Sequence, residues 1–184
     1  MTAPRLEKLR HFIHEVDRLH REHHQTAPLL DAVAQRLAAL VRYDDWLPEE
    51  YTLPHPHHYQ QYLLHADSGE RFSIVSFVWG PGQATPIHDH RVWGAIGMLR
   101  GAEENQRYQL DTDGIPRALG AATLLEAGQV EKVSADDGDI HRVSKCAGGS
   151  RLHQHSCLRR QYRRGEARRV YPGRAAETVY LRLL

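Results

Sequence analysis

The chain has 184 residues, a formal net charge of +1 with neutral histidines, and two cysteines. This length suits a single domain with a substantial core, and the small net charge gives no overall argument for nucleic acid or membrane partners. Two cysteines do not make a disulfide framework, and we find no apolar run typical of a signal peptide or a membrane span. We therefore expect a cytoplasmic protein.

Two helices are predicted at the beginning of the chain. Apolar residues recur at three- and four-residue steps over residues 6–19 and again over residues 29–41. His20 and His24 have the i, i+4 spacing that can bind zinc, but a solvated polar helix face explains this pair more simply. We therefore expect a helical segment over residues 1–45 whose histidines face solvent.

The middle of the chain has the texture of a β-protein. Residues 47–58 contain several prolines without periodicity and are predicted to be a loop, in which three histidines should be exposed: His55, His57 and His58. Short runs rich in β-branched and aromatic residues, bounded by glycine or aspartate, then predict strands at 59–65, 72–79, 92–99, 103–110, 122–125, 130–133 and 140–143. Many short strands with glycine-rich turns indicate a sandwich or a barrel.

Residues 82–101 contain the strongest candidate for a functional site. His88 and His90 are two positions apart, and on a strand such residues point to the same face, where two imidazoles can share a metal ion. Pro86 precedes the pair and is tolerated at the start of a strand. The pair alone is weak support for metal binding, because His-x-His also occurs in ordinary loops.

The spacing of glycines and histidines in this stretch resembles the first motif of the cupin superfamily. The second cupin motif is matched by the sequence Gly-Asp-Ile-His that ends at His141. Gly94 stands where most cupins carry a glutamate ligand, and three histidines without a carboxylate resemble the cysteine dioxygenase type I family. The run Tyr-Leu-Leu-His before the first motif and Gly-Met-Leu-Arg-Gly-Ala-Glu after it are similar to bacterial members. The resemblance implies a double-sheet jelly-roll barrel over residues 59–144.

This resemblance also implies a cofactor and a reaction. Fe(II) would be held by His88, His90 and His141, and a site of three neutral imidazoles favours an anionic thiolate as a further ligand. The implied reaction transfers both atoms of O2 to the sulfur of a small thiol-carboxylate and gives the sulfinate. The spacing alone does not distinguish iron from zinc, manganese or nickel. No nucleic acid or membrane partner is expected, and the oligomeric state is left open.

Gln61 is the candidate for binding the substrate carboxylate. Animal-type cysteine dioxygenases have an arginine at the matching position, and a glutamine there resembles the 3-mercaptopropionate dioxygenase subgroup. Glutamine makes a neutral hydrogen bond where arginine makes a bidentate charged one. The simpler interpretation is that Gln61 is a polar strand residue. Because Gly94 has no side chain, it excludes the cysteine–tyrosine crosslink of the animal enzymes, and Trp93 is predicted to belong to the core.

Two other functions remain open from the sequence. One is a metal-dependent cupin isomerase or another cupin enzyme, against which stands the glutamate missing at Gly94. The other is a non-enzymatic metal- or ligand-binding cupin such as a sensor, with the arginine-rich stretch 159–174 as a nucleic-acid arm. Metal analysis and oxygen uptake with a panel of thiols would separate all three functions.

Residues 145–184 are atypical within this single predicted domain. Lys145 occupies the place of an asparagine in the resembling family, and the family's later Ser-x-His-x-Tyr strand, which supports the iron site, is missing. Read one base out of phase from codon 145, degenerate codons can encode that strand at the family's offsets. We therefore interpret residues 145–184 as a frameshifted tail that lacks the strands closing the barrel, so that its product should fold poorly there and have weak activity.

Overall fold

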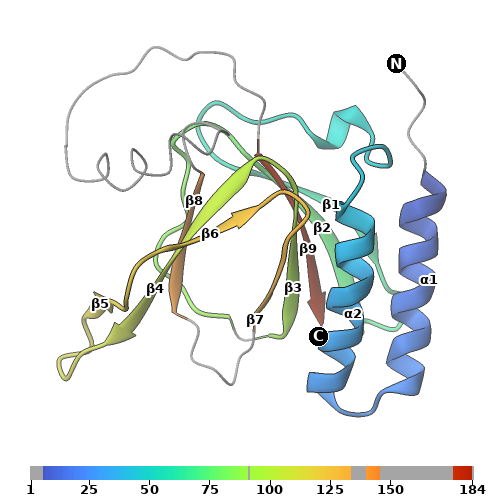
Figure 1. Ribbon diagram of the computed structural model, residues 1–184, viewed down its shortest axis with the longest axis horizontal. Coiled ribbons are helices and arrows are strands. Elements are labelled where there is room, and N and C mark those ends of the chain that lie inside the picture. Colours follow the sequence, from blue (N-terminus) through green and yellow to red (C-terminus); the bar gives the residue numbers. More distant parts are fainter. Residues whose placement is uncertain (1–5, 91, 134–139, 146–175, 184) are drawn as a thin grey trace.

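The computed structural model describes residues 6–90, 92–133 and 140–145 with their side chains, and the backbone of residues 176–183. Helices α1 (Leu6–Glu22) and α2 (Thr26–Val41) lie side by side along one wall of a β-barrel (Figure 1). The 3-10 helix η1 (Glu49–Tyr51) lies in the connection to the barrel. The strands are β1 (Gln60–Ala66), β2 (Phe72–Trp79), β3 (Gly94–Arg100), β4 (Ala102–Leu110), β5 (Pro116–Ala118), β6 (Thr123–Glu126), β7 (Val130–Val133), β8 (His141–Lys145) and β9 (Ala176–Leu183).

The strands form two antiparallel sheets that enclose the barrel interior. The first sheet has the order β1-β2-β9-β3-β7, and in the second sheet β4 pairs with β5, β6 and β8. This arrangement confirms the predicted fold class, a mainly β jelly-roll barrel of the cupin type behind a helical segment. Within the described part of the chain, no helix is long and apolar enough to cross a membrane.

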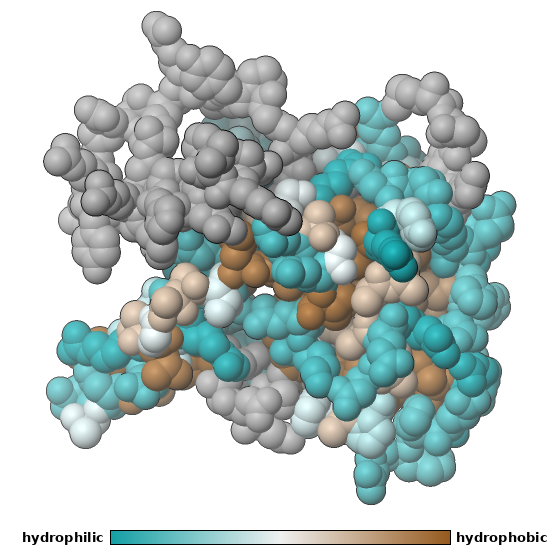
Figure 2. Space-filling model, in the orientation of Figure 1, coloured by the Kyte–Doolittle hydropathy of each residue, from teal (hydrophilic) through white to brown (hydrophobic). Residues whose placement is uncertain are grey.

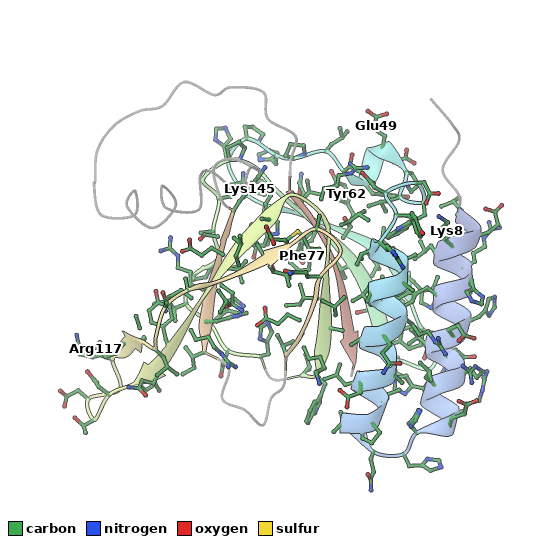
Figure 3. All side chains as sticks on the ribbon, in the orientation of Figure 1. Lys8, Glu49, Tyr62, Phe77, Arg117 and Lys145 are labelled. Atoms are coloured by element: carbon green, nitrogen blue, oxygen red, sulfur yellow. The ribbon has the colours of Figure 1, made fainter. Side chains whose placement is uncertain are left out.

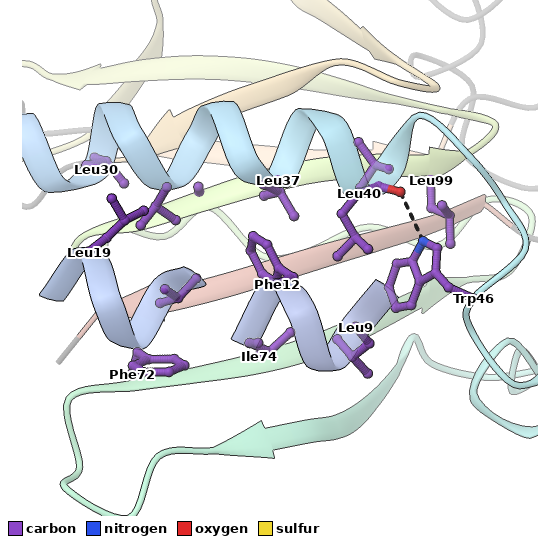
Figure 4. Packing of buried hydrophobic residues seen from close by; sticks show 14 of the residues in the cluster. Leu9, Phe12, Leu19, Leu30, Leu37, Leu40, Trp46, Phe72, Ile74 and Leu99 are labelled. Carbon is purple, nitrogen blue, oxygen red and sulfur yellow. Dashed lines mark hydrogen bonds between the residues drawn. The ribbon is translucent and has the colours of Figure 1, made fainter. Parts of the chain in front are cut away.

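The first sheet buries one face against the helices. Phe72 and Ile74 of β2 and Ala95 and Leu99 of β3 lie in one core cluster with the apolar faces of both helices (Figure 4). The helices contribute Leu9, Phe12, Val16 and Leu19 from α1 and Leu29, Leu30, Val33, Leu37, Leu40 and Val41 from α2. Their outer surfaces are mostly hydrophilic (Figure 2), as expected for helices that bury a single stripe.

Gly97 lets α2 approach β3 closely. A Cβ atom at this position would lie 2.9 Å from both Leu37 Cγ and Val41 Cγ1. Carbon atoms in contact normally keep about 3.5–4.0 Å apart, so only a residue without a side chain fits beneath this part of the helix. The contact fixes the distance between the helical layer and the sheet.

The other face of the first sheet lines the barrel interior. Ile96 and Met98 of β3 form a second core cluster with Leu125 and Val133. Phe77 of β2 also points into the barrel (Figure 3), where it helps to line a cavity. The interior is therefore partly packed with apolar side chains and partly hollow, which leaves room for a site.

Strand β9 differs from the sequence prediction. The tail was expected to supply no strand for closing the barrel, yet β9 lies between β2 and β3 and pairs with both along its length. The prediction failed because the arginine-rich stretch 159–174 dominated the interpretation of the tail, although Thr178, Val179 and Tyr180 of β9 are residues that favour strands. The remaining tail residues, 146–175 and 184, lie outside the described residues, and so does the arginine cluster. The frameshift concerns the gene and stays a prediction.

Candidate metal centre

The first two histidines of the site come from the connection between β2 and β3, which was predicted to be a strand. The structure differs, because this segment makes isolated β-bridges only, from Ala84 to Ser144 and from His88 to His141. Pro86 lies between these bridges and has no N–H to donate, so a continuous ladder cannot form there. The backbones of His88 and His141 still exchange two hydrogen bonds of 2.9 and 2.8 Å, which hold this segment against β8.

The three predicted histidines converge. One ring nitrogen from each of His88, His90 and His141 lies within 4.8 Å of the others, and the ring centroids are 4.7–5.1 Å apart. The Nε2 atoms of His88 and His141 are 3.3 Å apart. Two metal–nitrogen bonds of about 2.1 Å that meet at about 90–110° separate their nitrogens by about 3.0–3.4 Å. The spacing therefore fits two imidazoles bound to one first-row metal ion.

Hydrogen bonds at the back of two rings orient them for such binding. The Nδ1 atom of His88 lies 3.0 Å from the carbonyl oxygen of Pro86, and that of His141 lies 3.0 Å from Oδ1 of Asn105. A partner of this kind on the outer nitrogen is typical of metal-binding histidines, because it fixes the ring and its protonation. His141 is only 2% exposed, so its ring is also held by packing.

The histidines lie on the wall of a cavity of about 410 Å³ inside the barrel. One part of its wall is aromatic and is made by Tyr59, Phe77 and Trp79, whose ring centroids lie 4.6–6.3 Å apart. The other lining residues are Gln61, Ser73, Val75, Thr85, His88, Asp89, His90, Val92, Ile96, Glu103, His141 and Val143. The cavity is of the size that holds a small molecule, and its walls are predominantly apolar apart from the histidines and a few polar groups.

Gln61 lies on the wall of the same cavity. On β1 it is paired directly with Phe77 of β2, and directly opposed residues in antiparallel strands point to the same side of the sheet. Its side chain is exposed, so it belongs to the open part of the wall. The structure thus brings Gln61 and the three histidines to one cavity, whereas a role in substrate binding stays a prediction.

Two carboxylates in the cavity were not singled out from the sequence. Glu103, only 3% exposed, and Asp89 both line it. Asn105 was missed as well, although it occupies the same face of β4 as Glu103. A signal for both residues was available in the sequence. Glu103 and Asn105 are polar residues at alternate positions of a predicted strand, which is unusual for a face that points into a core.

Other predicted positions have structural roles. Gly94 begins β3 and is buried, and Trp93 packs against the helical core as expected. His20 was predicted to face solvent, and this prediction is wrong. Its ring stacks on Phe72 with the centroids 5.7 Å apart. Lys145 ends β8 and donates a hydrogen bond of 3.2 Å from its Nζ to the carbonyl oxygen of Trp79. Burial lowers the pKa of the Lys145 ammonium group.

The exposed histidines of the loop behave nearly as predicted. His57 and His58 are exposed and His55 is half-buried. The rings of His55 and His58 stack with their centroids 3.8 Å apart, and burial together with the neighbouring His58 and His57 lowers the pKa of His55. Within the described part of the chain, the only group of three or more potential ligands close enough for one metal ion is the triad in the barrel.

The fold and the site together define a cupin-type barrel with a three-histidine candidate metal centre. No profile of a known protein family matches the chain. The chain is similar to a cupin 2 conserved barrel domain protein from Leptotrichia buccalis, at 10% identity and a TM-score of 0.45, over 74% of this chain and 46% of that one. It therefore spans less than half of that protein.

Two further solved structures overlap a similar share of this chain. One is an uncharacterised conserved protein with a double-stranded β-helix domain from Klebsiella pneumoniae, at 15% identity and a TM-score of 0.47, over 73% of this chain and 80% of that one. The other is a cupin superfamily protein from Desulfitobacterium hafniense, at 12% identity and a TM-score of 0.46, over 77% and 93% of the two chains. Identities this low carry no information about substrate.

Proposed function

We propose that the protein is a non-haem iron thiol dioxygenase of the cysteine dioxygenase type. Its substrate would be a small mercapto-carboxylate, 3-mercaptopropionate or L-cysteine, and its product the sulfinate. The observation that carries this proposal is the convergence of His88, His90 and His141, without a carboxylate in the group, on a cavity whose wall also holds Gln61.

The donor set fits a divalent iron ion. Three neutral imidazoles leave the full charge of the ion uncompensated, and such a centre attracts a thiolate better than one with a carboxylate ligand. Fe(II), when bound, would supply the redox chemistry that no side chain of the cavity offers. The overall change is balanced, since a thiolate and one O2 give one sulfinate, with sulfur oxidised by four electrons and both oxygen atoms reduced.

The protein's own contribution is to bind and orient the substrate. The aromatic rings of Tyr59, Phe77 and Trp79 give the cavity an apolar wall, against which the carbon chain of a small thiol would displace water, and polar contacts are stronger where water is displaced. The amide of Gln61 would donate a hydrogen bond to the substrate carboxylate. Because the amide is neutral, it would leave the charge of the carboxylate uncompensated. A substrate without an ammonium group needs no further polar partner, which favours 3-mercaptopropionate over L-cysteine.

L-Cysteine remains a second candidate substrate because of Asp89. This carboxylate lines the cavity beside the two histidines of the first motif, and an ammonium group could form an ion pair with it. Comparison of kcat/KM for the two thiols measures which group matters more. A clear preference for L-cysteine would overturn the role given to Gln61 and leave the thiol dioxygenase activity intact.

The decisive experiment combines metal analysis with oxygen uptake. Protein loaded anaerobically with Fe(II) is mixed with a panel of thiols, and oxygen consumption and the sulfinate product are measured, with zinc-loaded protein as the control. Thiol-dependent oxygen uptake that matches sulfinate formation supports the proposal. Iron binding without oxygen uptake would favour a non-enzymatic binding protein, and isomerisation of a substrate without oxygen would favour another cupin enzyme.

A further inference from the structure

Asn105 joins His141 to a carboxylate on the other sheet of the barrel. The Asn105 side chain is almost completely buried, and its Oδ1 atom lies 3.0 Å from Nδ1 of His141. Its Nδ2 atom lies 3.0 Å from both carboxylate oxygens of Glu131. Asn105 and His141 belong to β4 and β8 of one sheet, while Glu131 belongs to β7 of the other. The three residues therefore form a polar connection between the sheets.

The carboxylate of Glu131 fixes the orientation of the Asn105 amide. A carboxylate only accepts hydrogen bonds, so the amide of Asn105 must present its NH2 group to Glu131. The reversed amide would place an oxygen against two other oxygens. With the NH2 group held by Glu131, the amide oxygen faces His141 and can only accept. The Nδ1 atom of His141 therefore carries the proton, and its Nε2 atom presents a lone pair to the site.

His88 is held in the same tautomer by a different group. Its Nδ1 atom lies 3.0 Å from the Pro86 carbonyl oxygen, which also only accepts, so its Nε2 atom presents a lone pair as well. The Nε2 atoms of His88 and His141 are 3.3 Å apart. Two lone pairs at this distance repel each other, and a cation placed between them turns the repulsion into two coordinate bonds. The arrangement is thus prepared for a metal ion before one binds.

We propose that Glu131 and Asn105 are positioning residues that keep His141 in its metal-binding tautomer. We call this connection the Glu131–Asn105–His141 relay. The proposal rests on the proposed metal site but is independent of the reaction catalysed there. The relay also places a negative charge behind the amide, which polarises it and makes the His141 imidazole a stronger electron donor. A site with three neutral ligands gains more from such support than one with a carboxylate ligand of its own.

A structural role alone would give a different outcome. A hydrogen-bonded connection between two sheets would stabilise the barrel whichever nitrogen of His141 carried the proton. The relay instead requires one defined tautomer in the absence of metal. The first test therefore uses the unaltered protein, freed of metal and labelled with 15N at histidine. Long-range proton–nitrogen correlation spectra identify which ring nitrogen of His141 is protonated, and we expect Nδ1.

The second test uses Glu131→Gln, with Glu50→Gln as the control. A glutamine at position 131 can donate or accept, so the Asn105 amide is free to reverse and to move the His141 proton to Nε2. We expect mixed tautomers for His141 and Co(II) binding weakened about 10- to 100-fold. Glu50 is exposed, and its replacement makes the same charge change with no effect on either measurement. Asn105→Leu removes the amide and should weaken Co(II) binding similarly.

The outcomes separate the relay from the proposed function. Protonation of His141 at Nε2 in the metal-free, unaltered protein would overturn the relay directly, without relying on a variant. So would a Glu131→Gln protein that melts earlier while its tautomer and Co(II) affinity stay unchanged. Protein that binds Co(II) with the expected tautomer but oxidises no thiol would overturn the dioxygenase proposal and leave the relay standing.

Discussion

Replacing Gly97 by alanine should destabilise the protein by overpacking the contact between α2 and β3. The new Cβ atom would meet Leu37 Cγ and Val41 Cγ1 at 2.9 Å and Leu37 Cδ2 at 3.1 Å. Three contacts that are short by about 0.5–1 Å require the helix or both side chains to move. Because Leu37 is completely buried, its side chain has no open space to enter. Overpacking of this kind costs about 1–3 kcal/mol.

The free energy of unfolding is measured by urea denaturation, and Tm is measured by thermal denaturation. For a domain of this size a loss of 1 kcal/mol corresponds to about 2–4 °C in Tm, so we expect Gly97→Ala to melt about 2–12 °C lower. Val41→Ala removes one of the two obstructing side chains. In the double variant the effects should therefore be less than additive, with a coupling energy of about 0.5–2 kcal/mol.

Two results would refute this reasoning. A change of less than about 0.5 kcal/mol for Gly97→Ala would mean that α2 adjusts without cost. Strict additivity with Val41→Ala would mean that the added methyl group does not meet this side chain. Metal affinity serves as an internal check, because Gly97 faces the helices and its replacement should leave the three histidines in place.

Four further predictions concern the site, the pH dependence of folding and the gene. Alanine at His88, His90 or His141 should each abolish retention of Fe(II), measured by metal analysis, because the described residues offer no spare ligand in the group. Gln61→Ala should raise KM for 3-mercaptopropionate about 2- to 10-fold in steady-state assays, through loss of one neutral hydrogen bond. Burial and the nearby Arg71 lower the pKa of His20, so the folded state resists its protonation. Stability should therefore decline as the pH falls below the unfolded value of about 6.5, and His20→Phe should flatten this dependence in denaturation curves between pH 7 and 5. Resequencing of the gene should find an extra base within codon 145, and the intact mass of the natural protein should differ from that of the present sequence.

Each of these predictions has an outcome that contradicts it. Full iron content in any single histidine variant would show that the triad is not the binding site. An unchanged KM for Gln61→Ala would reduce Gln61 to a polar strand residue. Identical pH profiles with and without His20 would remove it as a source of acid sensitivity. A lysine codon in frame at position 145, with an intact mass that matches the present sequence, would refute the frameshift interpretation.

The metal triad could be predicted because the information is local. Two motifs, one with His88 and His90 and one with His141, carry their own spacing, and the β-bridge between His88 and His141 brings them together. The relay could not be predicted in this way. Asn105 and Glu131 look like ordinary polar strand residues, and their contact depends on how the two sheets face each other. Sequence periodicity says which side of a strand is buried, but not which residue of a distant strand lies opposite.

Sequence periodicity also failed to predict the shortest elements and the last strand. Strands of seven or eight residues such as β1 and β2 were found almost to the residue, whereas the three-residue elements η1 and β5 are too short to show a repeat. Strand β9 was missed because its flanking composition dominated the interpretation. Its place in the sheet, between β2 and β3, depends on pairing with strands about a hundred residues away in the sequence, which periodicity does not report.

The position of β9 has a consequence for how the chain folds during synthesis. Phe72 of β2 pairs with Leu183, at the far end of the sequence, so these partners are joined by a loop of about a hundred residues whose closure is slow. Until residues 176–183 have been made, β2 and β3 expose unpaired edges toward each other. Such edges are templates for aggregation. A nascent or shortened chain should therefore need chaperone protection. Any alternative reading of the gene must also encode a strand that fits between β2 and β3.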